Sequence, residues 1–268
     1  MRYKVGGDMK ALRAEGAAQT WGLWARSDLG VSALGDLVGE VRLDHTRLRD
    51  RLGGGLVRND RHLDVVSLVL SGAVRNQSLR GGATHWSAER SQGVLTFDDA
   101  ETADLDSYTA RTAGQFARWS FDIDHTQALT AKDSLVLKLS YQGSSGNLDP
   151  AQKFEGGGVY GLRALDTGKI SGDTGVLARA EFQRDLGDHL GHWTAAPFVE
   201  FARVQTNRSP WAGPVEIKTV TGAGLALYGA IPGGASASFY TAAVTSAEGL
   251  QDQRPGRLRL GARLIQAF

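Results

Sequence analysis

Two charged side chains, Arg163 and Glu200, are of the types that can hold a loop against a sheet. Arg163 lies in a glycine-rich stretch from Asn147 to Gly175 that shows no helix or strand period, and loops of this length are usually functional or disordered. Glu200 lies between aromatic residues in Phe198–Val204. A guanidinium binds a carboxylate through two parallel hydrogen bonds. We therefore hypothesise that Glu200 fixes Arg163, the alternative being the commoner solvated loop arginine.

Motifs for catalysis or cofactor binding are weak in this sequence. Gly156–Gly161 matches GxGxxG, but a dinucleotide fold needs a helix to open there, and Leu162–Gly168 has no helical pattern. His189 and His192 are three apart in a turn-like segment, with no third ligand at metal spacing. No GxSxG elbow is present. We expect no catalytic residue, no metal ion and no cofactor.

Composition excludes further classes. The chain has 30 basic and 29 acidic residues, so a nucleic-acid partner has no electrostatic support. It has no cysteine, which excludes disulfides and thiolate metal sites. No secretory signal follows Met1. A mature fragment, an internal start and a cytoplasmic protein are all consistent with such a beginning.

Alternating apolar and polar residues are typical of strands with one wet face and indicate about eleven strands. Six precede the glycine-rich stretch and five follow it. The first starts at Trp21, and the others lie at 36–48, 63–75, 82–97, 117–124, 135–142, 176–185, 192–206, 216–229, 235–246 and 257–268.

One uncharged segment, Thr219–Ala247, is long enough to cross a membrane as a helix. It contains several glycines and Pro232, which break helices. The pattern therefore favours a hairpin with its turn at Ile231-Pro232-Gly233-Gly234.

Two architectures fit the alternation. A soluble sandwich usually has strands of about five to six residues, whereas these segments are about twice as long and carry charges on one face. A membrane barrel with lipid outside and water inside requires that pattern. We predict an all-β chain forming an antiparallel transmembrane barrel, with Phe198 and Glu200 facing inward and Val199 and Phe201 facing lipid.

The glycine-rich stretch also carries a family resemblance. Leu148–Phe154, Gly156–Gly158 and Gly161–Leu165 resemble the signature loop of TpsB transporters, the haemolysin secretion/activation proteins of the ShlB/FhaC/HecB type in two-partner secretion. Leu162 and Leu165 stand where that family has valine and an aromatic residue. The resemblance implies that the loop folds into a sixteen-stranded barrel. It implies roles for Arg163 and for Phe154, Gly157, Gly158, Tyr160, Gly161, Leu162 and Leu165.

The family's wall motif, F-x-D-x-G-R-V, is similar to Phe198–Val204, with Glu200 in place of aspartate and Ala202 in place of glycine. Pro210–Gly213 and Thr221–Leu227 resemble the following loop and strand. The final strand, ending at Phe268, resembles the membrane-insertion signal. The resemblance thus implies a lock between Arg163 and Glu200, supported by Phe198.

Only about six strands precede the loop where the family has eleven, so we expect a partial barrel that lacks the periplasmic POTRA domains. Residues 1–20 are expected to be an incomplete strand and loop region, and 21–268 the outer-membrane barrel, with 147–175 as a loop in its lumen.

The implied function is non-enzymatic secretion of a large partner exoprotein across the bacterial outer membrane. The implied partners are that exoprotein, unfolded in transit, the lipid bilayer and the barrel assembly machinery. Arg118, Asp122, Arg179, Glu181 and Arg259 would keep the pathway wet. Two alternatives remain open: the translocator of a classical autotransporter, and an outer-membrane barrel enzyme.

Overall fold

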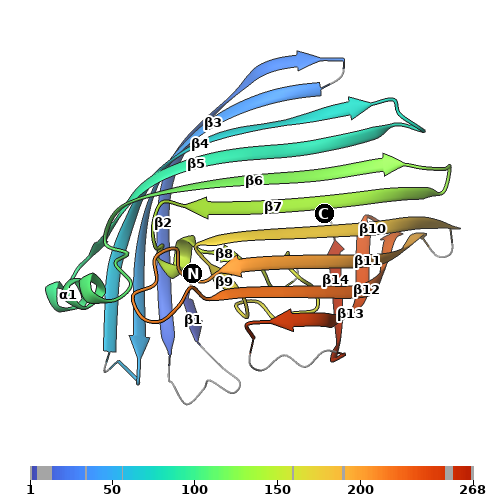
Figure 1. Cartoon of the computed structure of the whole chain (residues 1–268). Helices are drawn as coiled ribbons and strands as arrows, with labels where there is room; N and C mark the ends of the chain where they lie inside the picture. The colour runs from blue at the N-terminus through green and yellow to red at the C-terminus, as the bar shows by residue number, and fades with distance from the viewer. Residues whose placement is uncertain are drawn as a thin grey trace.

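A computed structural model of the chain describes residues 2–4, 14–33, 35–55, 57–158, 160–188, 191–250 and 256–266. Its main feature is one antiparallel sheet in which each strand pairs with the next in sequence (Figure 1). The sheet consists of β1 (Arg2–Lys4), β2 (Glu15–Ser32), β3 (Gly35–Leu52), β4 (Val57–Asn76), β5 (Gly82–Phe97), β6 (Gly114–Ala128), β7 (Asp133–Ser144), β10 (Thr174–Asp188), β11 (His192–Gln205), β12 (Ile217–Ile231), β13 (Ala235–Glu248) and β14 (Leu258–Gln266).

The eleven long strands, β2–β7 and β10–β14, confirm the predicted number and their six-and-five division around the loop. The two-layer sandwich is wrong, because all of these strands belong to a single sheet. The β pattern begins earlier than expected, since β2 starts at Glu15 rather than Trp21. Within the described residues the strand order runs from β1 to β14 without a pairing that joins these two edges.

The strand pairing puts one set of side chains on each face of the sheet. In the β7–β10 pair, Leu139 lies opposite Ala178 on one face, and Lys138 lies opposite Arg179 on the other. On β11, Phe198 and Glu200 are buried, whereas Val199 is 59% exposed. The sheet therefore has an apolar outward face and an inner face that carries charges, as the alternation predicts.

Connections of unequal length lie at the two ends of the sheet. One end has the long segments 98–113, 145–173 and 206–216. The first of these contains α1 (Ala100–Tyr108), a helix the sequence did not reveal, whose N-terminus is capped by the Asp99 carboxylate. The other end has short turns.

One of these short turns is the predicted hairpin between β12 and β13, where Gly233 and Gly234 adopt φ values of +92° and +83°. No helix among the described residues is long and apolar enough to cross a membrane.

The segment between β7 and β10 lies on the concave side of the sheet (Figure 1). We call residues 147–175 the lumen loop. It contains η2 (Pro150–Gln152) and the two-residue strands β8 (Phe154–Glu155) and β9 (Ser171–Gly172), which pair with each other. Near its start, Leu148 packs with Leu63, Leu95 and Phe116 of the inner face. The predicted inward fold of this loop is thus what the structure has.

Candidate functional site

The tip of the lumen loop closes on itself through glycine backbone. The Gly156 N–H donates to Ile170 O (3.0 Å), and the Gly158 N–H donates to both Leu162 O (3.1 Å) and Leu165 O (3.0 Å). Gly158 has φ +91°, and a Cβ on Gly161 would lie 2.5 Å from Gly156 O. The glycines of the GxGxxG match therefore serve a compact turn that side chains at these positions would obstruct.

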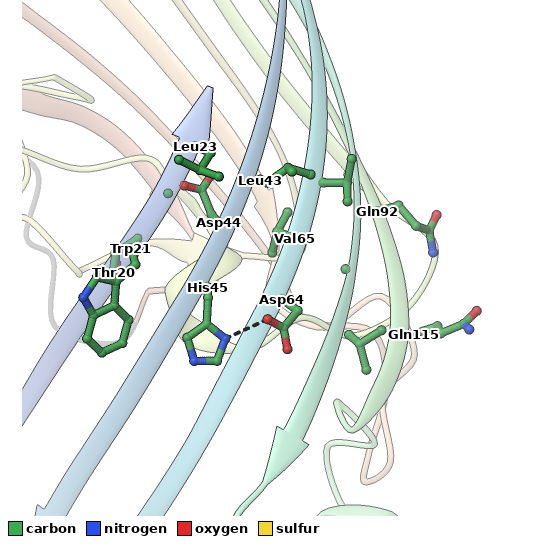
Figure 2. Close-up of a pocket in the computed structure, with 14 residues that line it drawn as sticks. Thr20, Trp21, Leu23, Leu43, Asp44, His45, Asp64, Val65, Gln92 and Gln115 are labelled. Atoms are coloured by element: carbon green, nitrogen blue, oxygen red, sulfur yellow. Dashed lines mark hydrogen bonds and ion pairs between the residues drawn. The ribbon is translucent and has the colours of Figure 1, made fainter. Parts of the chain in front are cut away.

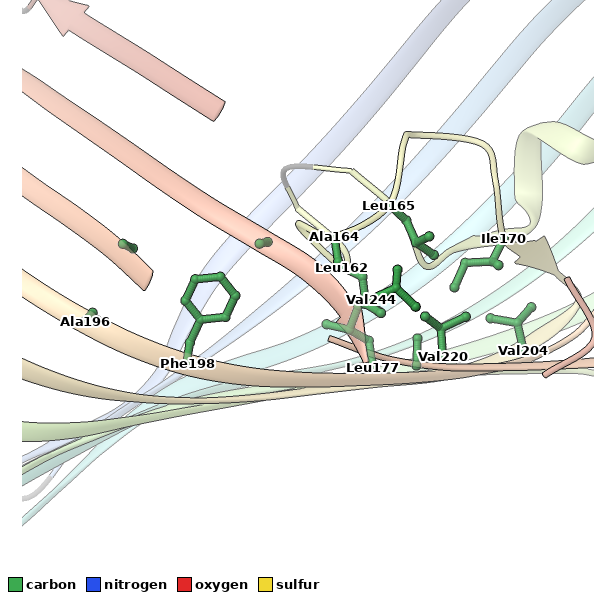
Figure 3. Packing of buried hydrophobic residues seen from close by; sticks show 13 residues of the cluster. Leu162, Ala164, Leu165, Ile170, Leu177, Ala196, Phe198, Val204, Val220 and Val244 are labelled. Atoms are coloured by element: carbon green, nitrogen blue, oxygen red, sulfur yellow. The ribbon is translucent and has the colours of Figure 1, made fainter. Parts of the chain in front are cut away.

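Apolar side chains fasten this tip to the inner wall (Figure 3). Leu162, Leu165 and Ile170 are at most 1% exposed. They belong to one buried cluster with wall residues from four strands, namely Leu177, Ala196, Phe198, Ala202, Val204, Val220, Ala226, Ala242 and Val244. Leu162 and Leu165, which stand where the family has valine and an aromatic residue, are thus part of the packing core of the tip.

The other predicted loop residues have different surroundings. Gly157 forms a backbone bridge with Leu162. The half-buried Phe154 places its ring where a Cβ on Gly175 would be, 2.2 Å away. Tyr160 is 85% exposed and lies at the wall of a cavity of about 760 Å³ that Arg163 also lines.

Arg163 binds Glu181 of β10, not Glu200. Its Nη2 lies 2.5 Å from Glu181 Oε1 and 2.9 Å from the Tyr228 hydroxyl, which in turn donates to Glu181 Oε2 (2.9 Å). The guanidinium also stands over the Phe198 ring, 4.5 Å from its centroid. The expected direct pair is therefore replaced by a triangle of arginine, glutamate and tyrosine against an aromatic face.

The Glu200 side chain holds the same tip by binding the backbone of the loop. Its Oε1 accepts the Ala164 N–H (3.0 Å), and its Oε2 lies 3.2 Å from Arg179 Nη2. Arg179 also donates to Gly161 O and places its Nε 4.0 Å from Glu181 Oε1.

We name Arg163, Glu181, Arg179 and Glu200 the charge cluster. Its charges alternate along a chain of contacts, and each side chain is at most 10% exposed. Buried ions are tolerated where opposite charges and hydrogen bonds satisfy them.

Sequence reasoning put Arg179 and Glu181 on the inner wall but did not connect them with the loop. The signal that would have done so is the register of the β10–β11 hairpin, which places Arg179 opposite Glu200 and Glu181 opposite Phe198. Inward residues directly opposite on neighbouring strands are within reach of each other.

Wall glycines make room for the tip. A register shift between Thr221 and Gly222 interrupts the β12–β13 pairing, and a Cβ on Gly222 would lie 3.0 Å from Ala164 Cβ and 3.2 Å from Glu200 Oε1. A Cβ on Gly224 would lie 2.5 Å from the Phe198 ring. Close approach of loop and wall thus requires glycine at these positions.

A second set of contacts, which the sequence did not reveal, fixes the base of the lumen loop. Asp173, fully buried, accepts the backbone N–H groups of Leu148 (3.0 Å) and Arg208 (2.6 Å) and lies 3.2 Å from Lys153 Nζ. The Asn147 amide donates to Ala110 O (2.6 Å) and to Ser209 O (2.8 Å). The base therefore joins the three long connections at this end of the sheet.

Arg61 of β4 adds a buried ion pair at the base. It binds Asp149, and its Nη1 lies 2.6 Å from Asp50 Oδ2. Asp149 also accepts the Ala151 N–H and so caps η2. The contact ties the loop to β4, a strand that takes no part in the charge cluster at the tip.

The remaining predicted residues contribute less. Arg259 of β14 lies 2.8 Å from Asp166 at the loop tip, and Arg118 lies 2.7 Å from Glu89 on the inner wall. Asp122 is exposed. His192, an exposed residue at the start of β11, contacts Asp185 and Asp188 near the end of β10. His189 and Phe268 lie outside the described residues.

Comparison with known proteins gives this loop and wall a family. The family model described as "Haemolysin secretion/activation protein ShlB/FhaC/HecB" matches residues 2–227. The heme/hemopexin transporter protein HuxB of Haemophilus influenzae is 23% identical over 184 residues, which are 69% of this chain and 32% of HuxB. The chain thus spans about a third of the length of the curated relatives it matches.

Solved structures agree on the fold. CdiB from Escherichia coli superposes with a TM-score of 0.77 at 20% identity, over 94% of this chain and 46% of CdiB. CdiB from Acinetobacter baumannii gives 0.71 at 15% identity, over 98% and 45%. Family and fold together place the chain in the bacterial outer membrane. With most of its length matched by the family model and a lumen loop seated on the inner wall, the chain belongs to the ShlB/FhaC/HecB family of haemolysin secretion/activation proteins.

Proposed function

We propose that this chain is the barrel portion of an outer-membrane transporter that secretes a partner exoprotein, unfolded, across the bacterial outer membrane. The observation that carries the proposal is the lumen loop, whose tip is fastened to the inner wall by the charge cluster and by buried leucines. A loop of this kind lies in the path that a polypeptide would take through the sheet's concave side.

The inner wall suits a moving polypeptide. Glu89 lies 2.7 Å from Arg118 and 3.5 Å from Arg42, and Ser91 donates to it as well. Partly exposed pairs of this kind are worth about 0–1 kcal/mol each. They offer weak, exchangeable contacts to a passing chain while the wall stays wet.

The charge cluster would set the position of the loop more than the stability of the fold. The attraction within a buried ion pair is largely offset by the cost of removing both ions from water. Breaking one pair, however, leaves a buried charge without its partner. We propose that the tip bearing Arg163 shifts when the exoprotein passes and returns afterwards.

A secretion assay tests this function. The intact transporter carrying Arg163→Ala is expected to secrete the partner at a reduced rate, measured as partner protein in the medium relative to protein retained in the periplasm. Lys169→Ala is the matched control, because Lys169 is an exposed cation of the same loop. Unchanged secretion by Arg163→Ala, with normal barrel levels in the membrane, would show that the charge cluster has no part in transport.

We further propose that lipid and the barrel assembly machinery are partners of this chain. The outward leucines of β14, Leu258, Leu260 and Leu264, are 63–78% exposed and suit a lipid contact. We propose that Phe268, which lies outside the described residues, is part of the insertion signal. Phe268→Ala is expected to lower the amount of inserted barrel, measured by the heat-modifiable gel band of folded barrels.

Transport without a chemical step is also part of the proposal, and the family supports it as a family of transporters. Purified protein is expected to show no turnover of peptide and ester substrates. The autotransporter alternative is decided by the coding sequence upstream, where POTRA domains would support the present proposal and a passenger domain would contradict it.

A further inference from the structure

The lengths of the connections orient the sheet in the membrane. Outer-membrane barrels have short periplasmic turns and longer extracellular loops. Segments 98–113, 145–173 and 206–216 all leave the same end of the sheet. This end therefore faces the outside of the cell, and the strand ends beside it lie in the outer leaflet.

On the outward face, β3 changes character toward the extracellular end. Val41 and Leu43 are followed on the same face by His45, Arg47 and Arg49. The change marks the depth at which the hydrocarbon of the bilayer gives way to lipid headgroups.

A hollow lies in the outward face at this depth. Its volume is about 1120 Å³, and its outward apolar walls come from Trp21, Leu23, Leu43, Val66 and Val94 on four strands. Figure 2 shows it with His45 bonded to Asp64 on β4, a contact of 2.7 Å. The Trp21 ring stacks on His45 at 5.9 Å. A tryptophan at this position is typical of the membrane interface.

The outward carboxylates near the hollow have partners, whereas Asp44, which also lines it, belongs to the inner-face positions of β3. Asp60 is bound by Arg51, and Asp64 by His45. Asp98 lies 3.0 Å from His62.

Three exposed arginines of the outward face lie at the extracellular ends of β3 and β4, beside the hollow: Arg47, Arg49 and Arg58. The Arg47 guanidinium stands over the Trp21 ring, 6.0 Å from its centroid. None of them has an ion pair within the part of the chain that the structure describes. Arg47 and Arg49 are two residues apart on β3, which separates them by about 7 Å along the strand. Arg58, on β4, lies opposite Arg51 of β3.

We propose that this outward surface is a binding site for a phosphorylated lipid of the outer leaflet. The acyl chains would lie in the hollow between Trp21 and Val94, and the phosphates would lie among Arg47, Arg49 and Arg58. Guanidinium groups bind phosphate oxygens in paired hydrogen bonds. A zwitterionic lipid, whose own ammonium balances its phosphate, gains less from three arginines. The site requires only the outer-membrane location and does not depend on the proposed transport.

Native mass spectrometry of the intact protein tests the proposal. Diphosphorylated lipid A is titrated in parallel with the same lipid after removal of both phosphates. The phosphorylated lipid is expected to be retained selectively. Because each arginine near an anionic surface contributes about 1 kcal/mol, each single Arg→Ala change should weaken its binding about fivefold. The triple variant should weaken it on the order of a hundredfold.

Arg184→Ala is the matched control, since Arg184 is a 60% exposed arginine on the outward face of β10 at the opposite end of the sheet. It should bind the lipid as the unmodified protein does. Folding of each variant is checked by heat-modifiable gel mobility. Equal retention of the dephosphorylated lipid, or an equal loss in Arg184→Ala, would overturn the site.

Discussion

Replacing Arg163 by alanine should detach the tip of the lumen loop from the wall. The side chain is 10% exposed and its partner Glu181 is 3% exposed, so the change leaves a carboxylate buried without its closest cation. Removing one member of a buried pair costs about 3–5 kcal/mol. Glu181 keeps the Tyr228 hydroxyl and the Arg179 Nε at 4.0 Å, so we expect about 3 kcal/mol. The opening equilibrium of the tip should then rise on the order of a hundredfold.

The lack of cysteine in the chain makes this opening measurable. A single reporter, Leu165→Cys, lies at a position that is 1% exposed in the closed tip. Cysteine behaves as a small apolar residue when buried, and a maleimide should label it only when the tip opens. The labelling rate should rise on the order of a hundredfold in Arg163→Ala. A second reporter at the exposed Thr167 should label rapidly in every background.

Double variants distinguish the contribution of Glu181 to holding the tip from that of Glu200. Because Arg163 contacts Glu181, Glu181→Ala should open the tip and should add little to Arg163→Ala. Glu200→Ala removes a different contact, the one to the Ala164 N–H, so it should raise the labelling rate further in the Arg163→Ala background. Its coupling to Arg163→Ala, which runs through Arg179, should be smaller than that of Glu181→Ala. An unchanged labelling rate in Glu181→Ala, together with full non-additivity between Arg163→Ala and Glu200→Ala, would refute the assignment of Arg163 to Glu181.

Three further predictions test other parts of the structure, each with a variant for comparison. Gly224→Ala should lower the unfolding temperature of the barrel, measured by heat-modifiable gel mobility. The added Cβ would lie 2.1 Å from Thr241 O, and relieving this clash should cost about 1–3 kcal/mol. Gly146→Ala is the control, because no atom lies within 4 Å of its Cβ, and it should leave the unfolding temperature unchanged. Arg61→Ala should destabilise the loop base by about 3 kcal/mol, as seen in the denaturant midpoint. Arg51→Ala, which breaks the more exposed pair with Asp60, should cost less than about 1 kcal/mol. Hydrogen bonds from Thr102 and Glu101 hold the pKa of Asp99 in the folded protein below its value in the unfolded chain. The stabilisation that the Asp99 carboxylate gives α1 should therefore be complete above the pKa of Asp99 in the unfolded chain. It should be lost as the pH falls through the lower pKa of Asp99 in the folded protein. Amide exchange in α1 should show this loss in the unmodified protein, and no such acid-dependent change in Asp99→Ala.

Much of the sheet could be read from alternation because its two faces meet different solvents. The strand from Asp133 to Ser144 shows this, since Leu135, Leu137 and Leu139 face outward while the inward positions between them are polar except for Val136. The turn at Pro232–Gly234 could also be predicted from the sequence, because the positive φ values it requires favour the two glycines present there. By contrast, α1 carries no apolar stripe and packs little against the sheet, so its sequence holds no periodic signal.

The partner of Arg163 could not be read from a motif alone. Motif matching pairs Arg163 with Glu200, but the structure gives it Glu181, which lies two positions further along the neighbouring strand from the residue opposite Glu200. A long side chain selects among several inward carboxylates, and the selection depends on where the tip sits. That position is set by Leu162 and Leu165 against the wall and by Gly222, which has no side chain there.

Two separate fastenings suggest how the loop could move without leaving the sheet. The base is tied by Asp173, by Asn147 and by the Arg61–Asp149 pair, and these contacts also join the other long connections. The tip is tied by the charge cluster and by the buried leucines Leu162 and Leu165. Three members of the cluster, Arg163, Arg179 and Glu181, line a cavity with the exposed Tyr160 beside them. Since the base contacts involve backbone groups from several segments, releasing them would disorder the whole end of the sheet that carries the long connections. Releasing the tip breaks the charge cluster and the leucine packing but leaves the contacts among the three long connections intact. In the proposed transport, a passing polypeptide should therefore displace residues near Arg163 while Asp149 and Asp173 stay in place.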